Sequence, residues 1–265
     1  MRVFSVLIVL LGSLIFSPLN WAADAVVKPT VLITGANRGI GLEFVNQYSQ
    51  LGWTVIATAR KPADADELNE LAAERNNIIV EQLDVTDDAG IDALAEKYQS
   101  QPIDVLLNNA GITPKYLSAF RSLGGVDFDM AKRSYDVNAL GPLKMAEAFM
   151  PHVIASQQKK FIVISSKAGS FAEGPKRAMM YSYRASKAAL NMLMYTLAFE
   201  TEKEGVILTL LSPGQVNTMG LLGRMMPGAI QPEESVANMV KLIGSLTAEN
   251  NGQFLSHIDG SVIGW

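Results

Sequence analysis

Short apolar runs alternate with amphipathic helical patterns from Thr30 to the end of the chain. Strands are expected at residues 30–34, 54–58, 78–83, 103–107, 161–164, 207–211 and 253–256, and helices at about 40–51, 65–75, 88–98, 128–150, 183–203 and 232–246. Strands that alternate with helices are joined by right-handed crossovers, which produce a parallel sheet with helices on both faces. The sequence therefore predicts an α/β chain with a single doubly wound, Rossmann-type domain over residues 26–265 and about seven parallel strands.

A glycine-rich turn follows the first apolar run. Residues 34–41 read TGANRGIG, and apolar residues then recur at helical spacing. Where a strand turns into a helix, free backbone N–H groups and the positive end of the helix dipole can bind a pyrophosphate. A tight turn without a ligand is the alternative, because three glycines at this spacing also occur by chance. The candidate phosphate-binding residues are Gly35, Asn37, Arg38, Gly39, Ile40 and Gly41.

Charge and composition exclude several kinds of partner and site. The 265 residues include 22 Lys and Arg and 26 Asp and Glu, a net charge of −4, and the cations are scattered. Neither nucleic acid nor an anionic membrane surface is therefore expected to bind. The chain has no cysteine, which excludes disulfides, thiol catalysis and cysteine-ligated metals. His152 and His257 lie far from any partner motif, so both are interpreted as structural and no metal site is predicted.

Tyr183 and Lys187 stand four residues apart at the start of a predicted helix, which places them on one helical face. A phenol beside an ammonium is a candidate proton donor, because positive charge lowers a tyrosine pKa from its usual value of about 10. The alternative is a pair of partly exposed helix residues, since the chain has seven tyrosines and such spacings arise by chance.

Five motifs occur in one order along the chain: the glycine-rich turn, Asn108-Asn109-Ala110-Gly111, Ile164-Ser165-Ser166, the Tyr183/Lys187 pair and Ser212-Pro213-Gly214. With these motifs the chain, from Thr30 to Trp265, resembles the short-chain dehydrogenases/reductases. It is most similar to the carbonyl-reductase branch that includes sniffer-type reductases and C-factor-like signalling proteins. The sequence YRASK at residues 183–187 and the ending from Asp259 to Trp265 indicate this branch.

The resemblance implies a catalytic set. Tyr183 would be the general acid/base, and Lys187 would lower its pKa and bind the nicotinamide ribose. Ser166 would hydrogen-bond the substrate carbonyl, and Asn138 would hold a water that links Lys187 to solvent. Ser170 is the alternative to Ser166, because the segment between Ser166 and Tyr183 is longer than usual in the family. Without the resemblance, Ser166 and Asn138 could equally satisfy nearby backbone groups.

The same resemblance implies contacts with a nicotinamide dinucleotide. Asp84 would bind the adenine amine, Asn109 and Ala110 would lie over the adenosine ribose, and the Thr218 hydroxyl would hold the carboxamide. The other expected contacts are Val85, Gly111, Pro213, Gly214 and Val216.

The expected cofactor is NADP(H) rather than NAD(H). NAD enzymes place an acidic residue at the end of the second strand to bind the ribose 2′-hydroxyl. Arg60 stands there instead, and Arg38 lies in the glycine-rich turn. Two guanidinium groups suit a 2′-phosphate, which they can pair with bidentately.

The expected function is hydride transfer between NADPH and a small carbonyl or alcohol substrate. Residues 219–231 are expected to form either a mobile apolar lid over the substrate or an ordinary surface loop. The alternative is a nucleotide-binding signalling or sensing protein with little turnover. Related proteins range from monomers to tetramers, so a homodimer or homotetramer through the helices at 128–150 and 183–203 is possible.

The first 25 residues carry a separate signal. Arg2 precedes an uncharged apolar run over residues 3–16, and Ala23-Asp24-Ala25 fits a cleavage site. A signal peptide and a location in the secretory pathway or periplasm are expected. An uncleaved anchor is the alternative, since the run nearly reaches a membrane-spanning length if it extends to Ala23; only then would a membrane be a partner. A cytoplasmic location is the third reading, because reduced NADP is an intracellular supply.

Overall fold

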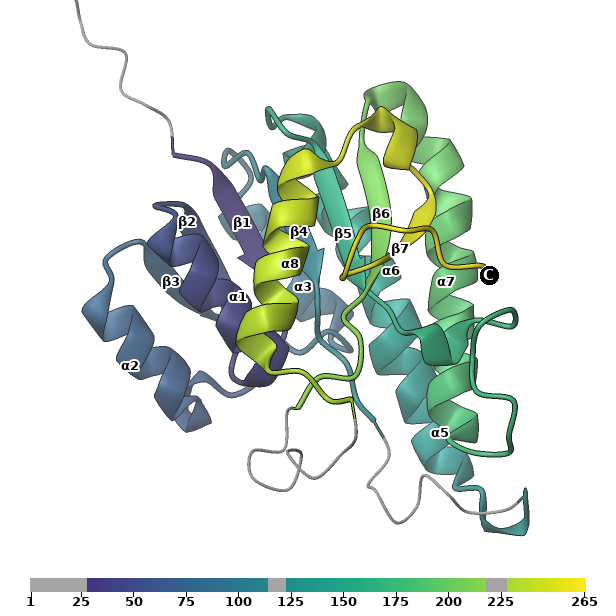
Figure 1. Cartoon of the computed structure of the whole chain (residues 1–265). Coiled ribbons are helices and arrows are strands. Elements are labelled where there is room, and N and C mark those ends of the chain that lie inside the picture. The colour runs from purple at the N-terminus through teal and green to yellow at the C-terminus, as the bar shows by residue number, and fades with distance from the viewer. Residues whose placement is uncertain (1–27, 114–122, 218–227) are drawn as a thin grey trace, which may run out of the picture.

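Seven parallel strands form the centre of the computed structural model, which describes residues 28–113, 123–217 and 228–265 (Figure 1). Their order in the sheet is β3-β2-β1-β4-β5-β6-β7, and each neighbouring pair is parallel. This confirms the predicted doubly wound α/β fold. The strands are β1 (Thr30–Ile33), β2 (Thr54–Ala59), β3 (Ile78–Gln82), β4 (Val105–Asn108), β5 (Lys160–Ile164), β6 (Ile207–Ser212) and β7 (Gln253–Ser256).

Helices cover both faces of the sheet (Figure 1). On one face α1 and α8 lie side by side, with α2 beside them; on the other lie α3, α6 and α7. The helices are α1 (Gly39–Gln50), α2 (Asp66–Glu74), α3 (Asp88–Lys97), α5 (Phe128–Tyr135), α6 (Gly141–Ile154), α7 (Tyr181–Thr201) and α8 (Pro232–Ser245).

The strands read as continuous apolar runs because both of their faces are buried. Successive side chains point to opposite faces, so Leu32 joins the core under α3, α6 and α7, whereas Val31 and Ile33 join the core under α1 and α8. All three are fully buried. The sheet therefore separates two apolar cores, each closed by one layer of helices.

The helix expected at residues 128–150 is the main departure from the predicted elements. It is α5, then a π-helical turn over Asp136–Leu140, then α6, which continues to Ile154. Pro142 has no N–H group to donate to the carbonyl of Asn138, so the α-helical hydrogen-bond pattern cannot continue there. The Gly141 N–H instead reaches back to the carbonyl of Asp136, five residues earlier.

The helix expected to open at Tyr183 begins two residues earlier. Met180 precedes it in the left-handed region, at φ 51°, and α7 starts at Tyr181. Other boundaries differ from the predicted ones by a few residues; for example, β4 spans Val105–Asn108 where 103–107 was predicted.

The carboxyl ends of β1, β4, β5 and β6 meet at one edge of the sheet, since these strands are parallel neighbours. From β1 the chain moves outward to β2 and β3 and then returns to β4 on the other side of β1. Such a switch point is where open α/β sheets bind ligands. In the described part of the chain, no helix is long and apolar enough to cross a membrane.

Candidate active site

The glycine-rich turn lies against the segment that follows β4. Gly35 has φ 67°, in the region that favours glycine, and a Cβ built on it would lie 2.8 Å from the Ala110 Cα. A Cβ on Gly41 would collide with the backbone carbonyl oxygen of Gly35 and lie 2.5 Å from the Asn109 Nδ2 atom. Both glycines are thus required by close backbone approach, and Gly39, at φ 57°, opens α1. Such a turn exposes first-turn N–H groups of α1.

Thr34 joins the turn to this segment, a role that sequence reasoning missed. Its Oγ1 accepts hydrogen bonds from the N–H groups of Asn109 and Ala110, each at 3.0 Å. The Asn109 side-chain amide donates to the carbonyls of Thr34 and Gly35, also at 3.0 Å. The Asn109 side chain therefore holds the turn in place. A hydroxyl at the end of an apolar strand, next to glycine, is the signal that could have indicated Thr34.

The N-terminal end of α1, next to the glycine-rich turn, has features that favour binding of an anion. Arg38 is the N-cap residue of α1, the first turn of α1 holds no acidic residue, and the Arg38 side chain is exposed. The Ala36 N–H donates to the Thr58 carbonyl at 2.8 Å, which brings the end of β2 beside the turn. Arg60, exposed, follows β2 directly. Glycines, a helix N-terminus and two exposed guanidiniums fit the pyrophosphate and 2′-phosphate of a dinucleotide.

The residues after β3 differ in their exposure. Asp84 is half-buried, and its Oδ1 accepts from both the N–H (3.0 Å) and the hydroxyl (2.8 Å) of Thr86. Val85 is buried, and its carbonyl lies so close to Gly141 that a Cβ there would approach it to 2.8 Å. Asp84 therefore has one oxygen held in a local turn, while Val85 packs against the start of α6.

Ser166 and Tyr183 are brought into contact by β5 and α7. Ser166 follows β5, caps the short turn Lys167–Gly169, and accepts from the Ala168 N–H at 3.1 Å. Its side chain is also hydrogen-bonded to Tyr183. Lys187, one helical turn after Tyr183, is buried and donates from Nζ to the Ile164 carbonyl at 2.8 Å. The three side chains, which were predicted from two separate motifs, thus gather at the carboxyl end of β5.

Without a bound cofactor, the pKa of Tyr183 is shifted in the direction opposite to the one expected from the sequence. Burial raises the pKa of Tyr183, and the hydrogen bond with Ser166 opposes that rise without cancelling it. Burial also lowers the pKa of Lys187 to about 8. An ammonium that is easily discharged lowers a neighbouring phenol's pKa less. The expected lowering of the Tyr183 pKa is therefore not a property of the protein alone.

Asn138 is fully buried in the π-helical turn. Its Oδ1 accepts from the Ile112 N–H at 2.7 Å, and its Nδ2 donates to the Ile112 carbonyl and to the Ser186 Oγ, both at 2.9 Å. A Cβ on Gly111 would lie 3.3 Å from this Oδ1 and 3.9 Å from the Lys187 Nζ. Asn138 therefore fixes the segment after β4 beside Lys187.

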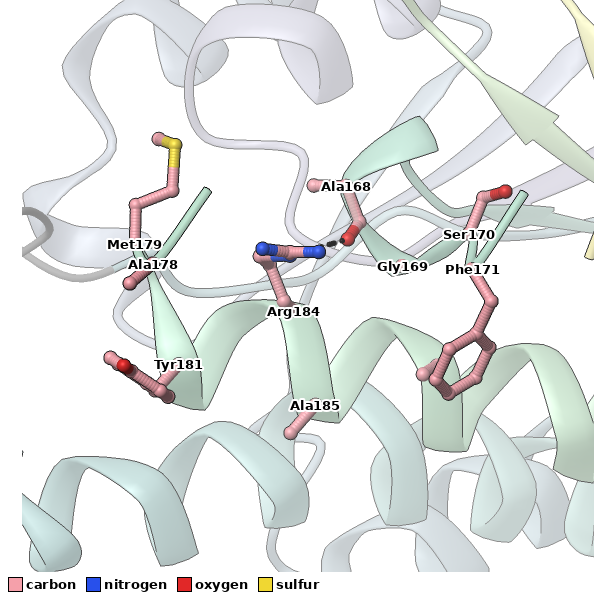
Figure 2. A pocket seen from close by; sticks show the side chains of 10 residues that line it. Ala168, Gly169, Ser170, Phe171, Ala178, Met179, Tyr181, Arg184 and Ala185 are labelled. Atoms are coloured by element: carbon pink, nitrogen blue, oxygen red, sulfur yellow. Dashed lines mark hydrogen bonds between the residues drawn. The ribbon is translucent and has the colours of Figure 1, made fainter. Parts of the chain in front are cut away.

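Ser170, the alternative to Ser166, is used elsewhere. Its Oγ donates to the Gly264 carbonyl at 2.5 Å and accepts from the Glu173 N–H at 2.8 Å. Next to it, the segment before α7 borders a partly open apolar cavity of about 270 Å³, which Figure 2 shows. Arg184 crosses its wall and donates to the Ala168 carbonyl at 3.2 Å. The cavity lies on the α7 face formed by Tyr181, Arg184, Ala185 and Ala188, and its lining does not include Tyr183 or Lys187.

The segment after β6 passes beside His257. Gly214 has φ 79°, and a Cβ on it would lie 2.5 Å from the His257 Cε1. The buried Pro213 accepts from the Ser235 Oγ at 2.7 Å, and Val216 bridges to Ile230. These contacts direct the segment along the carboxyl edge of the sheet. Thr218 lies outside the described residues, as does most of the lid expected at 219–231.

The two histidines serve packing. His152 is buried, with Nε2 3.1 Å from the Ala95 carbonyl, and His257 is buried beside Gly214. Burial is the largest effect on the pKa of His257 and lowers it. Among the residues that the structure describes, no three His, Asp or Glu side chains converge as a metal site would require.

Comparison with known proteins identifies the family of the chain. Residues 29–222 match the family model described as short chain dehydrogenase. The chain is 34% identical to the 1-hydroxy-2-glutathionyl-2-methyl-3-butene dehydrogenase of Rhodococcus sp. strain AD45, over 89% of this chain and 99% of that protein. It is 33% identical to the C-signal of Myxococcus xanthus, over 65% of this chain and 99% of that protein.

Solved carbonyl reductases share the whole fold. The NADPH-bound carbonyl reductase from chicken fatty liver superposes with a TM-score of 0.81 at 33% identity, covering 90% of this chain and 99% of that one. The carbonyl reductase Sniffer of D. melanogaster gives 0.80 at 29% identity, covering 90% and 100%. The chain belongs to the short-chain dehydrogenase family. It is an oxidoreductase of that family whose structure is carbonyl-reductase-like, which confirms the resemblance on which the expected function rests.

Proposed function

We propose that the protein is an NADPH-dependent reductase that transfers a hydride between the nicotinamide and a carbonyl or alcohol substrate. The observation that carries this proposal is the contact between Ser166 and Tyr183, beside the buried Lys187. It lies at the carboxyl edge of the sheet, on the same edge as the glycine-rich turn. Substrate identity is left at the level of small carbonyl compounds and the matching alcohols.

The residues would divide the work as follows. The bound nicotinamide would supply the hydride. The Ser166 hydroxyl would donate a hydrogen bond to the substrate oxygen, where negative charge develops during reduction. Tyr183 would deliver the proton to that oxygen, and its high pKa in the protein alone keeps it protonated for this step. Lys187, held by the Ile164 carbonyl, would bind the ribose and supply positive charge near the phenol.

The dinucleotide would lie across β1, β4 and β6. Its pyrophosphate would be held at the N-terminus of α1, its adenine near Asp84 and its 2′-phosphate by Arg38 and Arg60. Structural relatives with NADP(H) bound, including the chicken enzyme, support the preference for NADP(H). Asn109 and Ala110 would lie over the adenosine ribose, Gly111 would be a further contact, and Thr218 would contact the carboxamide.

The test is turnover with and without the Tyr183 hydroxyl. NADPH binding is followed by its fluorescence, and oxidation is then measured with a panel of aromatic ketones, quinones and aldehydes. Tyr183→Phe should bind NADPH normally and lose about 10²–10⁴-fold in kcat, the usual contribution of a general acid. Full activity in this variant, with tight binding retained, would refute the role of Tyr183.

A second candidate function is nucleotide sensing without appreciable turnover, which the similarity to the C-signal of Myxococcus xanthus favours. In that case NADPH binds but no member of the carbonyl panel is reduced. The contact between Ser166 and Tyr183 favours the reductase, because a sensor needs no proton donor.

Residues 1–25 are proposed to direct the chain to the secretory pathway or periplasm, or to anchor it. N-terminal sequencing of the protein from its native host tests this: a start at or near Val26 indicates cleavage, and an intact Met1 on a soluble protein contradicts it. A homodimer or homotetramer through α5, α6 and α7 is proposed as the assembled form.

A further inference from the structure

Residues 261–265, which we call the tail, run back along the edge strand β7. Leu255 and Val262 form an antiparallel bridge, and the Ile263 N–H donates to the Phe254 carbonyl at 2.7 Å. Ile263 is buried in the core, and the Trp265 ring packs against the ring of Phe254. The tail is therefore fixed to the body of the molecule on one side.

On its other side the tail holds residues 166–174, which we call the Ser166 loop. The Ser170 Oγ donates to the Gly264 carbonyl at 2.5 Å, and the Ala172 N–H donates to the Trp265 carbonyl at 2.9 Å. The Gly264 N–H in turn donates to the Glu173 Oε1 at 2.8 Å. Three hydrogen bonds thus join two segments that are some ninety positions apart in sequence.

Glu173 connects these bonds to the candidate active site. Its second carboxylate oxygen lies 3.0 Å from the Nζ of Lys167, the residue that directly follows Ser166. The Lys167 N–H donates to the Ser212 Oγ at 3.3 Å. The hydrogen bond from Gly264, and then that from Lys167, hold the pKa of Glu173 below its usual range, so the carboxylate is charged near neutral pH.

The Ser166 loop also contacts α7. A Cβ built on Gly169 would lie 2.8 Å from the Lys187 Cβ, and Arg184 donates to the Ala168 carbonyl. The Trp265 ring also packs on Tyr195 of α7, with centroids 5.2 Å apart. The loop that carries Ser166 is therefore clamped between the tail and the helix that carries Tyr183.

We propose that Glu173 is a positioning residue: by joining Lys167 to Gly264 it holds the Ser166 loop against α7 and keeps the Ser166 hydroxyl in contact with Tyr183. This inference rests on the proposed function, because Ser166 and Tyr183 are its readout. Glu173 itself touches neither substrate nor cofactor in this scheme. The ion pair with Lys167 is partly exposed and adds little to the free energy of unfolding. Its expected effect is therefore on the position of Ser166 rather than on stability.

The experiment compares Glu173→Ala and Glu173→Gln in the full chain. Glu147→Ala is the matched control, because Glu147 also forms a lysine pair, with Lys144 at 2.9 Å, on α6. Glu173→Ala should lower kcat about three- to tenfold while the Kd for NADPH stays unchanged. Glu173→Gln should recover part of the loss, since its amide oxygen can still accept from Gly264. Glu147→Ala should match the wild type.

A pH profile separates positioning from general destabilisation. The Ser166 hydrogen bond lowers the pKa of Tyr183, so loosening it should raise that pKa. Reduction requires a protonated Tyr183, and activity falls as pH rises through its pKa. The falling limb of kcat should therefore move to higher pH in Glu173→Ala and stay in place in Glu147→Ala. Melting temperatures of all variants establish that each is folded.

A double variant decides whether Glu173 acts through Ser166. In the Ser166→Ala background, Glu173→Ala should cause no further loss of kcat and no shift of the limb. Losses that multiply, or a fully active Glu173→Ala, overturn the inference. A wild-type protein that reduces no carbonyl overturns the proposed function instead, and the two failures are thereby distinguished. If Glu173→Ala does not fold, the same comparison is made with Glu173→Gln, which removes the ion pair with Lys167, and with Ser170→Ala, which removes the hydrogen bond to the Gly264 carbonyl.

Discussion

At the scale of single residues, burial sets the chemistry of the candidate site. Lys187 is 5% exposed and its pKa is about 8, while burial raises the pKa of Tyr183. The two groups are thus both driven toward their neutral forms. A bound cofactor and the Ser166 hydroxyl are what can shift this balance toward proton transfer.

The buried Lys187 should make the free energy of unfolding depend on pH. In the unfolded chain a lysine pKa is about 10.4, so between pH 8 and 10 the unfolded state binds a proton that the folded state has lost. The free energy of unfolding should therefore rise with pH in this window by up to roughly 3 kcal/mol from this residue alone. Below pH 8 both states are protonated and the contribution is constant at its least favourable value.

Urea denaturation of the wild type and of Lys187→Met, at intervals from pH 7 to 10, measures this effect. Other titrating groups are common to both proteins and cancel in the difference. The wild type should gain stability relative to the variant as pH rises. Parallel curves for the two proteins would show that the lysine is not desolvated.

Cofactor preference also belongs to single residues. Arg60→Glu should weaken NADPH binding about 10–100-fold, the value of one or two lost charge-assisted hydrogen bonds, and leave NADH binding unchanged or improved. Lys61→Glu makes the same charge change one position later, on an exposed side chain, and is the control. Equal losses in both variants would point to overall charge rather than to a 2′-phosphate contact.

At the scale of elements, the glycine-rich turn and α1 form one unit with the segment after β4. Gly41 faces the Gly35 carbonyl and the Asn109 amide at a distance where a methyl group cannot fit. Gly244, in α8, has open space around it. The same substitution, glycine to alanine, can therefore be compared at a crowded helical position and at an open one.

Gly41→Ala should lose both NADPH affinity and stability, by about 1–3 kcal/mol in the free energy of unfolding, because the turn must shift. Gly244→Ala should instead gain roughly 0.5–1 kcal/mol, since alanine favours a helix over glycine. Thermal unfolding with and without NADPH measures both. A harmless Gly41→Ala would contradict the tight contact with Asn109.

Local sequence patterns predicted the strands and most helices, because a buried strand and an amphipathic helix can each be identified from a short stretch of neighbouring residues. The π-helical turn was missed, since it arises where Pro142 follows a helical pattern that otherwise continues. Asn138 and Tyr183 could be placed by motif. The contacts of Glu173 could not, because its partner Gly264 is 91 positions away and neither residue carries a pattern.

At the scale of the whole molecule, one face of α7 is apolar and exposed. Met192 and Phe199 are 64% and 63% exposed, and Tyr181 and Tyr195 share the same side of the helix at 40% and 38%. Tyr195 and Phe199 pack edge to face, with ring centroids 5.0 Å apart. A stripe of this kind is typical of a surface that is covered by a partner, which supports the proposed homo-oligomer.

Phe199→Asp should convert an oligomer to a monomer by placing a charge in that surface, with little effect on the melting temperature of the subunit. Light scattering after size exclusion gives the mass directly. Lys203→Gln, beyond the end of α7, also changes the net charge by −1 and is the control for charge. A wild-type mass equal to one chain at micromolar concentration would contradict the proposed assembly.

The return of the tail along β7 has a consequence for how copies of this protein can meet. A parallel sheet ends in an edge whose free N–H and C=O groups invite another strand. Here Ile263 and Ser261 already bond to Phe254 and Ser256, so that side of the sheet is closed by the chain itself. Growth of the sheet into neighbouring molecules, the usual beginning of aggregation, is therefore blocked at β7.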